Sequence, residues 1–225
     1  MSRWGMLLLL TCAATPGKVR VYIDPGHGAK GNPGNDNCFC EEEQAVMLDL
    51  AMDLRTRLLA TGRYEVLLAR EPGETVDYWA RVDEAQAWGA AVFLSLHSDA
   101  RGVSQPGRCP TNPDQPGFAL LWSDEGALAS DRLALARSLA TAMASEGMTP
   151  YDGREYGVYG ADTVPGVFVD RHAPDQRILV LRRPLMPSVI IETHHAWNPV
   201  EAASWRTEET RAAFARAVDH ALRGG

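Results

Sequence analysis

Four side chains of this sequence could together hydrolyse an amide or an ester: His27, Glu43, His97 and Glu192. Two histidines and one carboxylate are the ligand set of catalytic zinc sites that keep a coordination position open for water. A further carboxylate within reach can accept the proton of that water. Each residue alone has an ordinary structural explanation, since histidines often cap turns and glutamates often open helices. The chemistry requires a fold that brings all four together.

The segment before His27 has the pattern of a β-strand. Residues 19–23 place Val, Val and Ile at alternate positions, a period of two that is typical of strands. Pro25 has no backbone N–H for a ladder, so the strand must end there, and the glycines on either side of His27 permit a tight turn. We therefore expect His27 just past the carboxyl end of a strand, where ligands bind in open α/β sheets.

The same arrangement recurs twice further along the chain. The apolar run 91–96 is followed by His97, and the apolar run 187–191 is followed by Glu192. Such runs are typical of buried parallel strands. Helical segments separate them, which predicts a single α/β domain with a mainly parallel, twisted sheet flanked by helices. Because parallel strands end at one rim, the site is expected at the carboxyl ends of the strands.

Glu43 belongs to a run of three glutamates, 41–43, that opens a predicted helix ending at Gly62. Carboxylates in a first turn suit the positive end of the helix dipole, and for two of the three that explanation is sufficient. A buried face follows at helical spacing: Met47, Leu50, Ala51, Leu54 and Leu58. Since this helix leaves the His27 loop, Glu43 can face the same rim.

The remaining elements complete the predicted framework. They are a strand at 64–69, a helix capped by Thr75 and running to Trp88, an edge strand at 117–122, a helix at 123–146 and a final helix capped by Thr207. Residues 148–177 show little periodicity and predict a long loop. Within it, 151–172 could form a lid or a wall of the substrate groove, or a surface excursion without a role.

Length and charge limit the classes of protein that the sequence can belong to. A chain of 225 residues can bury the core of one domain. Lys plus Arg number 22 against 29 Asp plus Glu, a net charge of −7, and no basic cluster suggests a nucleic-acid groove. No stretch after the amino terminus is long enough to span a bilayer. We predict a monomer that binds neither nucleic acid nor, stably, a membrane.

The amino terminus has the composition of an export signal. Arg3 precedes an apolar run that ends in small residues, so residues 1–15 predict a signal peptide and 18–225 the catalytic domain. The protein would then be periplasmic or secreted. The alternative is a lipid anchor at Cys12, because residues 9–12 loosely resemble a lipoprotein signal.

Export would place three cysteines, Cys38, Cys40 and Cys109, in an oxidising compartment, where disulfides are the default. A Cys40–Cys109 or a Cys38–Cys109 bridge would connect two loops that flank the predicted site, leaving one thiol unpaired. A zinc site made of these cysteines is the weaker interpretation, because the Cys-x-Cys spacing is narrow and a fourth ligand is missing.

Four blocks of sequence, in this order, carry a family resemblance: Ile23–Gly28 (IDPGHG), Glu43–Ala51 (EQAVMLDLA), Phe93–Ala100 (FLSLHSDA) and Pro187–Thr193 (PSVIIET) with Asn198-Pro199. The chain resembles the zinc-dependent N-acetylmuramoyl-L-alanine amidases of bacterial cell-wall turnover, from Val19 to Leu222. Arg70 and Arg81 also stand where that family carries arginine.

The resemblance implies an α/β domain around one Zn²⁺ ion, held by His27, Glu43 and His97, with Glu192 as the catalytic carboxylate. The family cleaves the amide between the lactyl group of N-acetylmuramic acid and the L-alanine of the stem peptide. Peptidoglycan would be the substrate, and an activator protein could be a partner. Arg70 and Arg81 would bind substrate.

This chain departs from the family pattern after Glu192, where His194-His195 stands in place of the usual Gly-Phe. These imidazoles could contact substrate, orient Glu192 or be solvated, and we take His194 as a candidate for substrate binding. Ala29 and the Cys38–Cys40 insertion also differ from the pattern.

Two alternative functions follow from the same residues. One is another zinc peptidase or an N-acyl amino-acid amidohydrolase on this scaffold. A carboxypeptidase would need a cation for the terminal carboxylate, and Arg70, Arg81 and Arg101 are candidates. The other is a metal-free binding protein, which the presence of all four site residues disfavours.

Overall fold

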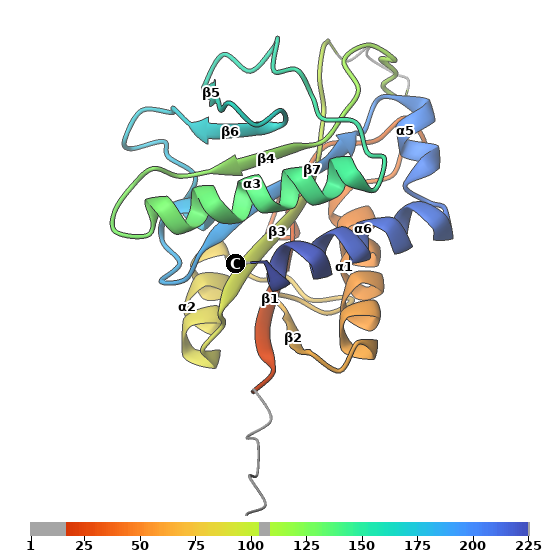
Figure 1. The fold of residues 1–225 in the computed structure, drawn as a ribbon. Helices are drawn as coiled ribbons and strands as arrows, with labels where there is room; N and C mark the ends of the chain where they lie inside the picture. The colour runs from red at the N-terminus through yellow and green to blue at the C-terminus, as the bar shows by residue number, and fades with distance from the viewer. Residues whose placement is uncertain (1–16, 104–108, 225) are drawn as a thin grey trace, which may run out of the picture.

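The centre of the molecule is one seven-stranded sheet, and the computed structural model describes residues 17–103 and 109–224 (Figure 1). The strands are β1 (Val19–Pro25), β2 (Tyr64–Leu68), β3 (Val92–Asp99), β4 (Ala119–Trp122), β5 (Tyr159–Ala161), β6 (Val167–Asp170) and β7 (Ser188–His195). They lie in the order β2-β1-β3-β7-β4-β6-β5. Four neighbouring pairs are parallel and two are antiparallel, so the predicted α/β fold with a mainly parallel sheet is confirmed.

Helices cover both faces of the sheet. They are α1 (Glu43–Ala60), α2 (Tyr78–Trp88), α3 (Ala129–Ser145), α4 (Leu179–Arg182), α5 (Pro199–Ser204) and α6 (Glu208–Arg223). One core lies between the sheet and α1, α3 and α6, and it contains Val21 and Ile23 of β1. The other lies against α2 and α4, and it contains Tyr22 of β1 and Phe93 of β3. Successive side chains of β1 therefore point to opposite faces of the sheet and are buried in two different cores.

Strand β4 corrects one prediction. It was expected at an edge, but it lies between β7 and β6 and pairs with β7 in antiparallel orientation. Its residues explain the interior position, because Leu120 is buried in one core while Ala119 and Leu121 are buried in the other. An edge strand would leave part of this apolar surface exposed.

The long segment 148–177, predicted as a loop, contains strands β5 and β6. They pair in antiparallel orientation and form the end of the sheet, with Tyr159 opposite Asp170. The strands have three and four residues, which is too short for a period of two to stand out in the sequence.

The sequence predicted the presence of the helices better than the residues at which they begin. Asp77, not Thr75, caps α2, because its carboxylate accepts from the Trp79 backbone N–H at 2.8 Å. Helix α1 begins at the third of the three glutamates, Glu43. The prediction of Thr207 as the cap of α6 is confirmed.

No helix within the two described ranges combines the length and apolar character needed to cross a membrane. The predicted signal peptide, 1–15, and the alternative lipid site at Cys12 lie outside the described residues.

Candidate active site

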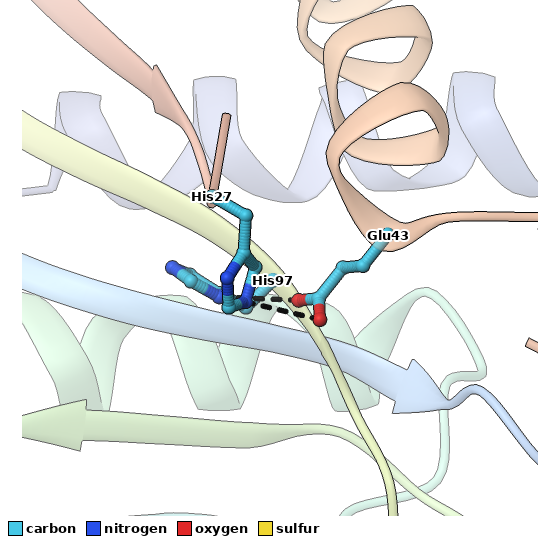
Figure 2. A group of neighbouring side chains, drawn as sticks. All are labelled: His27, Glu43 and His97. Carbon is cyan, nitrogen blue, oxygen red and sulfur yellow. Dashed lines mark hydrogen bonds and ion pairs between the residues drawn. The ribbon is translucent and has the colours of Figure 1, made fainter. Parts of the chain in front are cut away.

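His27, Glu43 and His97 meet at the carboxyl end of β1 and β3 (Figure 2). His27 follows β1, His97 lies near the end of β3, and Glu43 is the first residue of α1. The distance from His27 Nε2 to Glu43 Oε2 is 3.0 Å, and that from His97 Nδ1 to Glu43 Oε1 is 3.1 Å. The candidate ligand atoms of the three residues all lie within 4.8 Å of one another, so a single ion could contact all three.

Two glycines make this close approach possible. A Cβ on Gly26 would lie 2.5 Å from the His97 ring, and a Cβ on Gly34 would lie 2.7 Å from both Glu43 and His27. His27 itself has a φ of 60°, in the left-handed region that costs energy for a residue with a side chain. The turn is therefore built to bring the His27 ring against the other two side chains.

Neighbouring groups fix the Glu43 carboxylate, which is only 3% exposed. Oε2 accepts from the side-chain amide of Asn35 at 2.6 Å, and Oε1 accepts from the backbone N–H of Ser98 at 2.9 Å. Burial by itself would raise the pKa of Glu43, but the hydrogen bonds and charges of His27 and His97 hold that pKa well below its usual range. Glu43 is thus an anion locked in one orientation.

The orientation of His27 indicates a site for a cation. Asn32 donates its amide to the Tyr78 hydroxyl at 2.9 Å, so its oxygen is the atom that accepts from His27 Nδ1, also at 2.9 Å. With its proton on Nδ1, a neutral His27 presents the lone pair of Nε2 to a carboxylate oxygen. Those two acceptors repel each other unless a proton or a metal ion lies between them. The donor set of two imidazoles and a carboxylate therefore fits zinc.

Glu192 lines a cleft of about 400 Å³ together with His27 and His97. It was expected just past the end of its strand, but β7 continues to His195, and Glu192 pairs in register with His97. Its Oε2 finds no hydrogen-bond partner within the described part of the chain. Burial, and then the charges of Asp99 and Glu43, raise the pKa of Glu192 well above its usual value. Such a carboxyl group is suited to taking up a proton.

Arg70 and Arg81 lie behind the cleft rather than on its wall. Arg81 is fully buried and forms an ion pair with Asp24, N to O 2.7 Å, while also donating to the His27 carbonyl at 2.6 Å. Arg70 is 4% exposed and donates to the carbonyls of Gly26 and Gln44. Both guanidinium groups therefore hold the backbone of the His27 turn.

His194 and His195 are both buried, so the alternative that they are solvated is wrong. His194 is 2% exposed, its ring stacks on Trp205 with centroids 5.5 Å apart, and its Nδ1 is 2.9 Å from the Thr193 hydroxyl. Burial lowers the pKa of His194 to about 3. His195 Nδ1 accepts from the Arg101 backbone N–H at 3.3 Å. Neither residue lines the cleft that holds Glu192.

Of the two alternative disulfide pairings predicted from the sequence, one is present. Cys40 pairs with Cys109, with Cα atoms 5.0 Å apart, and Cys38 is the free thiol among the described cysteines. The bridge connects the segment before Glu43 to the loop that follows β3. It therefore links two of the segments that carry candidate ligands.

Several residues of the site were missed from the sequence. Asn32 and Asn35 orient His27 and Glu43, and Tyr78 and Tyr159 line the cleft. The asparagine-rich loop 32–37 beside a candidate ligand was an available signal, since amide side chains supply the hydrogen bonds that orient metal ligands. Tyr159 comes from the 151–172 segment that was predicted as a lid or a wall, and it stands on the cleft wall.

Comparison with known proteins adds to this geometry. A family model described as N-acetylmuramoyl-L-alanine amidase matches residues 21–223. The chain is similar to the N-acetylmuramoyl-L-alanine amidase CwlM of Bacillus licheniformis, 38% identical over 87 residues, which cover 37% of this chain and 33% of that protein. It is also similar to AmiA of Escherichia coli, 26% identical over 227 residues, covering 90% and 74%. The chain spans about a third to a half of the first curated relatives it matches.

Solved structures show the same fold. The catalytic domain of CwlV from Bacillus (Paenibacillus) polymyxa has a TM-score of 0.68 at 22% identity, covering 92% of this chain and 97% of that one. Ami1 from Mycobacterium smegmatis has a TM-score of 0.70 at 22% identity, covering 92% and 95%. The CwlD amidase of Clostridioides difficile, solved with the GerS lipoprotein, has a TM-score of 0.62 at 17% identity, covering 92% and 98%. At these identities the likeness concerns the fold alone.

Proposed function

The chain belongs to the N-acetylmuramoyl-L-alanine amidase family, and from this premise we propose that it is a zinc-dependent enzyme that cleaves peptidoglycan. The bond is the amide between N-acetylmuramic acid and the L-alanine of the stem peptide. The observation that carries the proposal is the convergence of His27, Glu43 and His97 within 4.8 Å, with Glu192 in the same cleft.

His27, Glu43 and His97 would hold the ion through two imidazole nitrogens and one carboxylate. When bound, zinc supplies a Lewis acid for the scissile carbonyl and lowers the pKa of water in the site. Asn32 and Asn35 keep the His27 ring and the Glu43 carboxylate in place. We propose that Arg70 and Arg81 position the His27 turn, in place of the substrate contact predicted from the sequence.

Glu192 would act as the general base and then as the general acid. It accepts a proton from the attacking water as the water oxygen bonds to the carbonyl carbon. It then gives that proton to the leaving nitrogen as the C–N bond breaks, which releases a lactyl carboxyl group and a stem peptide with a free amine. The raised pKa of Glu192 supports this role, because a more basic carboxylate takes up the proton of the attacking water more readily in the first step.

The composition of the cleft favours the amidase over a carboxypeptidase. A carboxypeptidase needs a cation for the terminal carboxylate, and among the described residues neither Arg nor Lys lines the cleft. Arg101, the third candidate, is buried and bound to Asp99, N to O 2.8 Å. The second alternative, an N-acyl amino-acid amidohydrolase, is not distinguished from the amidase by the residues of the cleft. The products that each enzyme would release distinguish them.

Digestion of purified peptidoglycan tests the proposal. Wild type should free stem peptides with new L-alanine amines and leave the glycan strands intact, as seen by mass spectrometry. Glu192→Gln keeps the shape of the side chain but removes the proton acceptor, so its rate should fall about 10²–10⁴-fold. Glu209→Gln, at an exposed position of α6, is the matched control and should keep the wild-type rate. Release of D-alanine instead, or substantial activity in Glu192→Gln, would contradict the assignment.

We also propose that the protein acts outside the cytoplasm. The apolar run near the amino terminus supports export, and the Cys40–Cys109 disulfide is typical of oxidising compartments. That the protein is a monomer and that it has an activator protein as a partner both remain predictions.

A further inference from the structure

Tyr159 is the first residue of β5 and lines the same cleft as His27, His97 and Glu192. It comes from the end of the sheet farthest from β1, so it reaches the cleft from the side opposite His27. Its surroundings suggest that it acts on the substrate.

The ring of Tyr159 is held between two others. Its centroid is 5.0 Å from that of Tyr156 and 5.4 Å from that of His172, which meets it edge to face at 83°. Such aromatic pairs have preferred geometries and stabilise one ring position. Tyr159 is therefore not a freely rotating surface side chain.

A carboxylate anchors each of these two neighbours. The Tyr156 hydroxyl donates to Asp99, which also accepts from Arg101 Nε at 2.8 Å. His172 Nδ1 is 2.7 Å from Oδ1 of Asp170, a fully buried residue. The Tyr156–Asp99 contact connects the segment before β5 to the end of β3, while the His172–Asp170 contact holds the residues that follow β6. Together they fix the cleft wall before substrate arrives, as preorganised catalysis requires.

The hydroxyl of Tyr159, unlike its ring, is unengaged. It makes no hydrogen bond with any residue in 17–103 or 109–224, whereas the other cleft tyrosine, Tyr78, already accepts from Asn32. Burial, followed by the charges of Glu192, Asp170 and Asp99, raises the pKa of Tyr159 far above its usual value. The phenol thus keeps its proton throughout the pH range in which the enzyme would work, so it can donate a hydrogen bond.

We propose that Tyr159 is a further catalytic residue, whose hydroxyl donates a hydrogen bond to the scissile carbonyl oxygen as negative charge develops on that oxygen. This inference rests on the proposed amide hydrolysis. The carbonyl oxygen is the substrate atom on which negative charge develops as the water adds, and the Tyr159 hydroxyl is a neutral donor in the same cleft as Glu192. A donor held in position and aimed at developing charge is worth more in the transition state than in the ground state.

Tyr159→Phe tests the inference, since it removes the hydroxyl and keeps the ring between Tyr156 and His172. With a soluble muramyl peptide, kcat should fall about 10²–10³-fold, the usual loss for one such donor, while KM changes little. A tetrahedral phosphinate analogue of the scissile amide should bind to the variant more weakly by a similar factor. The product peptide, which carries no such anionic oxygen, should bind equally to both proteins.

Tyr64→Phe is the matched control. The Tyr64 hydroxyl donates to the Asp219 carboxylate at 2.8 Å, and Tyr64 lies on β2 against α6 and does not line the cleft. This variant should keep the wild-type kcat and phosphinate affinity. Thermal unfolding of Tyr159→Phe near the wild-type temperature excludes a general loss of folding.

The outcomes separate the two proposals. An active wild type whose kcat and phosphinate affinity are matched by Tyr159→Phe overturns this inference and leaves the proposed function intact. A loss confined to KM, with phosphinate and product weakened equally, also overturns it, because the hydroxyl would then only bind the ground state. A wild type that frees no stem peptide overturns the proposed function and this inference together.

Discussion

At the scale of single residues, the site is defined by groups that determine which atoms of the histidines face inward. The chain of contacts from Tyr78 through Asn32 to His27 Nδ1 leaves Nε2 directed at Glu43. The hydrogen bonds from Asn35 and Ser98 fix the orientation of the Glu43 carboxylate in the same way. Since a ligand atom with a fixed direction loses little entropy on binding, these neighbours would contribute to the affinity for the proposed zinc ion without touching it.

His194 gives a prediction about acid stability. Its folded-state pKa of about 3 lies below its ordinary value of 6.5, so below about pH 6.5 the unfolded chain binds a proton that the folded chain excludes. Folding stability should therefore fall as the pH drops from about 6.5 towards about 3. From pH 7 to pH 5 the contribution of this residue amounts to about 2 kcal/mol.

Chemical unfolding of wild type and His194→Gln at both pH values measures this contribution. The variant lacks the titrating group, so it should lose about 2 kcal/mol less than wild type over that interval. His220→Gln, at an exposed position of α6, serves as the matched control. Equal losses in wild type and His194→Gln would show that His194 is not held neutral in the fold.

At the scale of elements, the disulfide joins the segment that leads into α1 to the loop after β3. It closes a loop with a sequence separation of 69 residues, and by loop-closure arguments it should contribute about 2–4 kcal/mol to stability. Because Cys40 lies three residues before Glu43, losing the bridge should also loosen the carboxylate and weaken zinc binding.

The double variant Cys40→Ser/Cys109→Ser tests both effects through denaturant unfolding and competition with a zinc chelator. We expect a lower free energy of unfolding and a lower zinc affinity than in wild type. Cys38→Ser, which removes the free thiol, should change stability by less than about 0.5 kcal/mol. If the double variant binds zinc as tightly as wild type, the bridge stabilises the fold without supporting the site.

The elements also show how far the sequence could predict the structure. The long apolar runs of β3 and β7 and the alternation in β1 are local signals, and they placed His27, His97 and Glu192 on one rim. Strands β5 and β6 are too short for a local signal, and the contact between Asp99 and Tyr156 joins residues 57 positions apart. Pairings of that kind depend on tertiary packing, which no periodicity reveals.

At the scale of the whole molecule, one sheet supplies the frame for both walls of the cleft. His27 follows β1, and His97 and Glu192 lie on β3 and β7. Tyr159 lies on β5, at the end of the sheet farthest from β1 (Figure 1). The net charge of the chain is −7, and among the described residues neither Arg nor Lys lines the cleft, so the protein side chains there offer no cationic partner to an anionic group. Selection is left to shape and hydrogen bonding.

The central claim is that one zinc ion is shared by three side chains that lie far apart in the sequence. Anomalous diffraction at the zinc edge, from crystals of zinc-saturated protein, tests it most directly. We expect one peak per chain, in contact with His27 Nε2, His97 Nδ1 and a Glu43 carboxylate oxygen, and we expect the peak to be lost in Glu43→Gln. A peak at any other place, or a bound ion that any of the three residues fails to contact, would contradict it.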